Sequence, residues 1–187
     1  MIFHLVRKVG FPCIQYTIIE DPALVGRANS TLGIARQRVL IEDKRSNIVY
    51  SLRQTNLLLK LISIIPFLGM IIRAPFYLYI DGAKCAKFKR SYKNSAYSWK
   101  IQDDFYELYS GQNETSILTR NEKQVATYQK NRISVCEKNE YVITLNVSDN
   151  LIPYYVLLCI FVDVTFYNNY RRWALFRYER TVVPKSK

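Results

Sequence analysis

Apolar and polar residues alternate along most of this 187-residue chain, which is the pattern of half-buried β-strands. In AYSWKI (96–101), Tyr97, Trp99 and Ile101 fall on one face, while Ser98 and Lys100 fall on the other. The same alternation recurs in RVLIED (38–43), NIVYSLRQ (47–54), FYLYI (76–80) and YVITLNV (141–147). The pattern therefore predicts a sheet with one side in a core and one side in water.

Short polar turns separate these predicted strands, for example IDGAK (80–84) and RNEKQ (120–124). Three segments, 39–54, 78–91 and 117–131, repeat one plan of strand, charged turn and second strand. Because no helical pattern alternates with the strands, parallel βαβ units are not expected. The sequence predicts antiparallel hairpins, hence a sandwich or a barrel.

The stretch LLLKLISIIPFLGMII (57–72) departs from this alternation, since Lys60 is its single charged residue. Two interpretations stay open. It forms barrel strands with a turn at Pro66–Gly69, or it is an exposed apolar segment that contacts a membrane or a partner. The residues expected to make that contact are Leu58, Ile62, Ile65, Phe67 and Met70.

The second departure is LIPYYVLLCIFVDVTFYNNY (151–170), the most apolar stretch of the chain. A helix from Leu151 to Tyr167 would be roughly 25 Å long, against about 30 Å for a bilayer core. A helix that is apolar on all sides must be surrounded, and a closed antiparallel sheet can surround it. We therefore predict a central core helix at about 151–168, with a single membrane span over 151–170 as the alternative.

The order of these segments resembles the tubby-like superfamily, specifically its bacterial LURP-one-related branch, which is related to phospholipid scramblases. The resemblance covers roughly residues 34–170 and rests on IDGAKCAKF, AYSWKIQDDFYELYSG, KQVATYQKNRISVCEKNEYVITL and VLLCIFVDV. It implies a closed barrel of about twelve antiparallel strands threaded by a hydrophobic C-terminal helix, and a role at membranes. The long apolar 57–72 stretch departs from the family. No acidic cluster like the scramblase calcium site is present, so calcium dependence is not implied.

We expect one domain, residues 1–170, followed by a basic C-terminal extension, 171–187. Asp163 is the one charged residue placed within the predicted helix. It is either an ion or proton site, or a structural carboxylate paired with an Arg, Lys or Tyr of the barrel wall.

The net charge is +12, and an excess of that size favours an anionic partner. Five basic residues without an acid gather at 84–93, namely Lys84, Lys87, Lys89, Arg90 and Lys93. They form either a stripe that binds lipid phosphates or an ordinary solvated face. Nucleic acid is a competing partner, although an RNA reader would usually expose stacking aromatic residues beside the lysines.

No catalytic motif appears in the sequence, and its single histidine, His4, is interpreted as a surface or edge-strand residue. The four cysteines are too scattered for a zinc site, and they indicate a reduced, cytoplasmic chain. We expect no enzyme activity, no cofactor and no metal. The predicted function is a binding module that associates peripherally with anionic phospholipid at the inner membrane face. The alternative is a protein- or nucleic-acid-interaction module without a lipid role.

Overall fold

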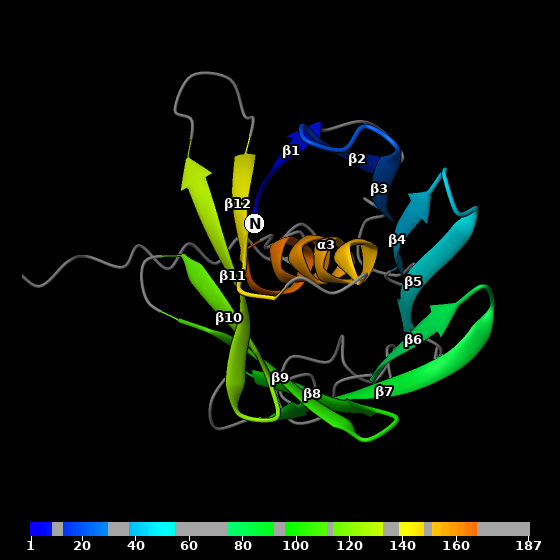
Figure 1. Cartoon of the computed structure of the whole chain (residues 1–187), viewed down its shortest axis with the longest axis vertical. Helices are drawn as coiled ribbons and strands as arrows, with labels where there is room; N and C mark the ends of the chain where they lie inside the picture. Colours follow the sequence, from blue (N-terminus) through cyan, green and yellow to red (C-terminus); the bar gives the residue numbers. More distant parts are fainter. Residues whose placement is uncertain are drawn as a thin grey trace, which may run out of the picture.

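In a computed structural model of the chain, twelve antiparallel strands close into one barrel around a helix (Figure 1). The structure describes residues 1–8, 13–29, 38–54, 75–91, 96–111, 114–132, 139–147 and 151–167. The strands are β1 (Ile2–Lys8), β2 (Cys13–Ile18), β3 (Leu24–Asn29), β4 (Arg38–Asp43), β5 (Ile48–Gln54), β6 (Phe76–Ile80), β7 (Ala83–Ser91), β8 (Ala96–Ile101), β9 (Asp104–Ser110), β10 (Thr115–Arg120), β11 (Lys123–Arg132) and β12 (Asn139–Leu145). Each strand pairs with its neighbour in sequence, and β1 pairs with β12 to close the ring. The predicted all-β barrel with one central helix is confirmed.

The repeated hairpins that the sequence indicates are β4–β5, β6–β7 and β10–β11. Two of them have the same detailed build. Positive φ angles at Asp81 and Gly82, and at Asn121 and Glu122, make tight two-residue turns whose twist suits a hairpin. In both hairpins, the register then shifts by one residue within the pairing. This β-bulge changes which side chains of the second strand face outward.

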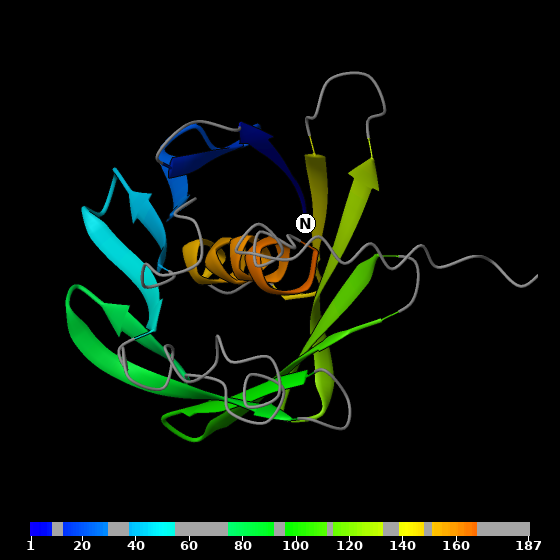
Figure 2. The same cartoon turned by 180° about the vertical axis from the view of Figure 1, so that it is seen from behind.

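The helix α3 (Ile152–Val162) continues into a π-helical turn, η1 (Asp163–Tyr167), and lies inside the ring of strands in both views (Figure 2). Its nine residues from Tyr154 to Val162 are all buried. The surrounding sheet supplies the partner that a helix apolar on every side requires. Over the ranges described, no helix has both the length and the hydropathy needed to cross a bilayer.

The helix packs unevenly inside the barrel. At β3 it comes so close that a Cβ atom on Gly26 would lie 2.3 Å from Cδ1 of Ile160. Across the barrel, aromatic rings fill the wider space, with Phe161 5.0 Å from Tyr97 and 5.6 Å from Phe88 between ring centroids. Glycine on one wall and aromatic residues on the other thus fix the helix off centre.

The two ends of the barrel differ. At one end of the barrel, hairpin turns follow β2, β4, β6, β8 and β10, and α3 begins there. We call this end the turn end. At the opposite end, the exit end, β5 finishes at Gln54, β6 starts at Phe76, and the helical segment finishes at Tyr167. The predicted contact stretch 57–72 and the predicted extension 171–187 both lie outside the described residues.

Candidate anion-binding face

The outer surface of β4 to β7 carries a row of basic and aromatic side chains. Arg38 on β4 pairs with Arg53 on β5, which pairs with Tyr77 on β6, which pairs with Lys87 on β7. Neighbouring strands are about 4.8 Å apart. The row therefore places three cations and one ring side by side across four strands near the exit end.

A second row, formed by Tyr79 on β6 and Lys84 on β7, runs beside the first because of the bulge in β7. Lys84 would share the inward face with the buried Ala86 and Phe88 if β7 alternated without interruption. Instead the register shift between Leu78 and Tyr79 sets Lys84 opposite Tyr79, and its side chain is exposed. The bulge thus adds a cation to the outer face.

Contacts between cations and rings join the two rows. Nζ of Lys84 lies 3.9 Å from the centroid of the Tyr77 ring, and Cζ of Arg53 lies 5.0 Å from the centroid of Tyr79. A cation over an aromatic face gains roughly 0.5–1 kcal/mol at an exposed site. These contacts hold the lysine and arginine side chains against the sheet and keep their charges at the surface.

Arg38 and Arg53 form a cross-strand pair of like charge. Partial burial, followed by the positive charge of Arg53, lowers the pKa of the Arg38 guanidinium. Arg53 donates a hydrogen bond from Nε to Oγ of Ser51 at 3.0 Å, which orients its guanidinium along the outer face. Like charges directly opposite one another destabilise a sheet, so this pair has a cost that a bound anion would remove.

Carboxylates approach this face only at its margins in the described strands. Glu42 lies four residues along β4 from Arg38, or roughly 13 Å at the rise of a strand. Glu107 on β9 pairs with Ser98, and Ser98 pairs with Lys89 on β7. The centre of the face is therefore basic. We refer to its cations Arg38, Arg53, Lys84, Lys87 and Lys89 as the basic band.

The predicted stripe at 84–93 is divided by the structure. Lys84, Lys87 and Lys89 are exposed on the outer surface. Arg90 faces the other side of β7, half-buried, with its guanidinium carbon 5.7 Å from the centroid of the Tyr97 ring. Lys93 lies outside the described residues. Arg90 is therefore not part of the band that the three lysines form.

Sequence reasoning missed Arg38, Arg53 and Tyr77. The alternation in 38–43 and 47–54 does place both arginines on the polar side of their strands. That pattern says nothing of register, and register is what sets Arg38 opposite Arg53 and Tyr77 opposite Lys87.

Asp163 occupies a separate polar centre inside the barrel. Its side chain is fully buried and accepts hydrogen bonds from the hydroxyls of Tyr16, at 2.6 Å, and Tyr141. Nε of Arg7 lies 3.8 Å from Oδ2 of Asp163. Burial, and next the charge of Asp163, raises the pKa of both Tyr16 and Tyr141. The partners come from β1, β2 and β12, so the carboxylate ties the end of the helix to the seam where the barrel closes.

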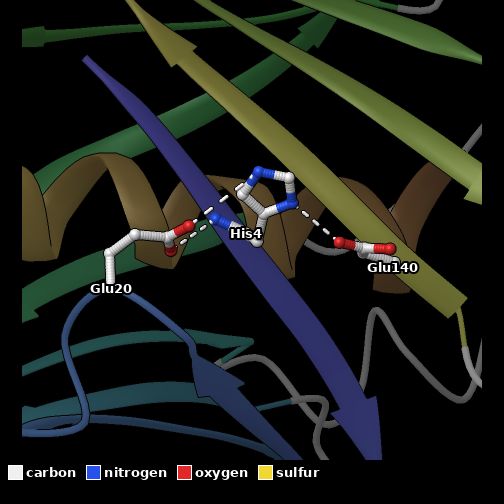
Figure 3. Close-up of polar contacts among 3 residues, drawn as sticks. All are labelled: His4, Glu20 and Glu140. Atoms are coloured by element: carbon white, nitrogen blue, oxygen red, sulfur yellow. Dashed lines mark hydrogen bonds and ion pairs between the residues drawn. The ribbon is translucent and has the colours of Figure 1, made fainter.

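His4 lies on the outer surface of β1, where β1 pairs with β12 to close the barrel. Its contacts join β1 to β12 and to the turn after β2, as Figure 3 shows. Its Nδ1 lies 2.7 Å from Oε1 of Glu140 on β12, and its Nε2 lies 3.9 Å from Oε1 of Glu20 in the turn after β2. Its backbone N–H also donates to Oε2 of Glu20 at 2.7 Å. The histidine is a surface residue, 39% exposed, that connects β1 to both of its neighbours.

Within the ranges described, no three histidine, cysteine or carboxylate side chains lie together in a group that could hold a metal ion. Cys85 is exposed and Cys159 is buried, and both are free thiols.

No family model, curated protein or solved structure matches the chain.

Proposed function

We propose that this protein is a binding module that associates peripherally with anionic phospholipid membranes through the basic band. The observation that carries the proposal is the cross-strand pair Arg38 and Arg53, with Lys87 in the same row two strands beyond Arg53, so that register holds these cations on one face. A stable fold gains nothing from such a pair, because like charges opposite one another destabilise a sheet. An anionic surface supplies the missing countercharge.

The size of the effect suits reversible membrane binding. Each basic residue near an anionic membrane contributes about 1 kcal/mol. The three cations of the band nearest the exit end, Arg38, Arg53 and Lys89, would therefore supply about 3 kcal/mol at low salt, and less at higher ionic strength as their charges are screened. Tyr77 and Tyr79, half-buried between the cations, have the amphipathic character that favours the headgroup region.

Nucleic acid is the second candidate, and one observation weighs against it. Single-strand binders usually present aromatic rings on which bases stack. Tyr97, an aromatic residue close to the lysines in sequence, is buried at 6% exposure. The ring of Tyr77 already has the Lys84 ammonium over it. Among the described residues, this face therefore favours a diffuse anionic surface over stacked bases.

A non-catalytic role, a cytoplasmic location at the inner membrane face and kinship with the tubby-like superfamily belong to the same proposal. The barrel that encloses a helix is the architecture that the resemblance implies. Our proposal concerns binding alone and requires no reaction at the basic band.

Liposome flotation tests the proposal with matched charge reversals. The test variant is Lys87→Glu plus Lys89→Glu, and the control is Lys44→Glu plus Lys123→Glu, whose residues are exposed at the turn end. Wild type and control should float with vesicles containing phosphatidylglycerol and stay behind with phosphatidylcholine alone. The test variant should lose most of its binding. Equal flotation of all three proteins would sink the proposal.

A gel-shift with salt titration addresses the second candidate. Binding to nucleic acid that gives a linear fall of log affinity with log salt, together with no flotation, would favour the nucleic-acid function. Flotation without a gel-shift supports the lipid function.

A further inference from the structure

We propose that the barrel meets the membrane at its exit end, with the turn end directed away from the lipid. This inference rests on the proposed function and names the face that docks. Among the described residues, charge is distributed unevenly along the barrel axis.

The turn end carries acidic residues in each of its hairpin turns. The acids lie in or beside the turns after β2, β4, β6, β8 and β10: Glu20 and Asp21, Asp43, Asp81, Asp103 and Asp104, and Glu122. An anionic surface would repel such a ring of carboxylates. The turn end is therefore the poorer candidate for contact with an anionic bilayer.

Two basic residues at the turn end, Arg45 and Arg120, form ion pairs with these acids. Arg45 forms an ion pair with Asp21, and Nη2 of Arg120 lies 2.6 Å from Oδ2 of Asp104. Hydrogen bonds from the side chains of Arg120 and Asn121 lower the pKa of Asp104, so this carboxylate keeps its charge. The seven acids of these turns outnumber the six basic residues that lie beside them, Lys44, Arg45, Lys84, Lys100, Arg120 and Lys123. The turn end therefore has no excess of positive charge to attract anionic lipid.

Charges near the exit end are not balanced in the same way. Arg38 is the first residue of β4 and Arg53 is the last but one of β5, so the like-charged pair lies at this end. Lys89 is two residues from the end of β7 and is exposed. The nearest described carboxylate by sheet register, Glu107, is two strands from Lys89. Glu114 and Glu140 also lie toward this end, but in the β9–β10 turn and on β12. An anionic surface therefore meets the excess of positive charge on the β4–β7 side.

Two labels on one strand test the orientation directly. Ser91 is the exposed last residue of β7 at the exit end, and Cys85 is exposed three residues after the turn at the other end. A nitroxide is attached either to the native Cys85 or to Ser91→Cys in a Cys85→Ser background, with Cys13 and Cys136 replaced by serine. Vesicles of phosphatidylglycerol carry a nickel-chelating lipid that broadens the signal of any nitroxide at the headgroup level.

On vesicle binding, the label at position 91 should be broadened strongly and the label at position 85 should change less than a third as much. Equal broadening at both positions, or stronger broadening at position 85, would overturn the end-on orientation.

Charge reversal at each end supplies an independent readout. The two double variants are Arg38→Glu plus Arg53→Glu at the exit end and Lys44→Glu plus Lys123→Glu at the turn end. Each replaces two positive charges by two negative ones and so lowers the net charge from +12 to +8. The first should weaken vesicle binding at least tenfold, and the second less than threefold, with circular dichroism confirming that both fold. Equal weakening contradicts the orientation but leaves lipid binding intact. Absence of binding by the wild type contradicts the proposed function itself.

Discussion

Arg38 on β4 and Arg53 on β5 face each other directly across the sheet, two cations at a position where opposite charges would stabilise the barrel. The like-charged pair lowers the stability of the sheet and concentrates positive charge at one place on its surface. Sites that sacrifice stability in this way are often functional. Removal of one arginine should raise the stability of the fold and weaken vesicle binding, and each effect can be measured separately.

Arg38→Gln should stabilise the fold and weaken vesicle binding at the same time. Removal of a like-charged cross-strand pair is worth about 0.2–1 kcal/mol, and the change should appear as a small rise in Tm. Arg27→Gln is the control, since Arg27 is exposed and pairs with Gln15 and Leu40. Thermal unfolding at low salt measures the effect. A fall in Tm for Arg38→Gln, with no change for the control, would show that the pair is stabilising.

Gly26→Ala should destabilise the barrel by about 1–3 kcal/mol, because the new Cβ atom would overlap Cδ1 of Ile160. Ile160→Val removes that Cδ1 atom and should cost about 0.5–1.5 kcal/mol alone. The double variant should then be more stable than the sum of the two changes predicts, which denaturant unfolding can determine. Strict additivity would mean that the helix does not lie against β3 at this point.

Asp163→Asn should be strongly destabilising, by about 3–5 kcal/mol, because it leaves the nearby Arg7 charge in a buried site without its countercharge. Tyr16→Phe removes one charge-assisted hydrogen bond and should cost about 1.5–3 kcal/mol. Urea unfolding of the two variants measures both losses.

The double variant Asp163→Leu plus Arg7→Met separates charge from packing. It should recover much of the loss seen in Asp163→Asn, since a buried ion pair can be replaced by apolar residues with little net cost. A double variant no more stable than Asp163→Asn would show that Asp163 does more than compensate Arg7.

Alkaline pH should unfold the protein through its buried tyrosines. Burial raises the pKa of Tyr128 and Tyr154 well above the ordinary value, as it does for Tyr16 and Tyr141. In the unfolded chain these phenols ionise near pH 10. The stability they contribute is therefore complete below pH 10 and is lost as pH rises above it.

Ultraviolet absorbance of the phenolate measures this effect. We expect exposed tyrosines to titrate first and the buried group to ionise together with loss of the circular dichroism signal. Ionisation of all 15 tyrosines in one smooth step near pH 10, with the fold intact, would contradict the burial.

Much of the fold follows from the sequence because it depends on local periodicity. Alternation in 96–101 places Tyr97 and Trp99 inward, and the structure buries both. The helix that is apolar on every side requires a surrounding wall, and the closed ring supplies it. These features depend on which face a side chain occupies, and period-two spacing determines that face.

The basic band was less predictable because it depends on register. The lysines of β7 are neighbours in sequence, whereas Arg38, Arg53 and Tyr77 come from three strands. The bulge that brings Lys84 outward is one extra residue at Cys85, which no composition or spacing rule identifies in advance. Asp163 was recognisable as a charge within an apolar helix, but its tyrosine partners on β2 and β12 became evident only in the closed barrel.

Equilibrium co-sedimentation across a series of lipid compositions measures whether the protein binds anionic phospholipid. The wild type is titrated with vesicles in which the phosphatidylglycerol fraction rises from zero to half, the remainder being phosphatidylcholine, at low and at physiological salt. We predict negligible binding without phosphatidylglycerol, a steep rise in affinity with its fraction, and weakening by salt. Binding that is absent throughout, or that is equally strong on phosphatidylcholine alone, would contradict the account.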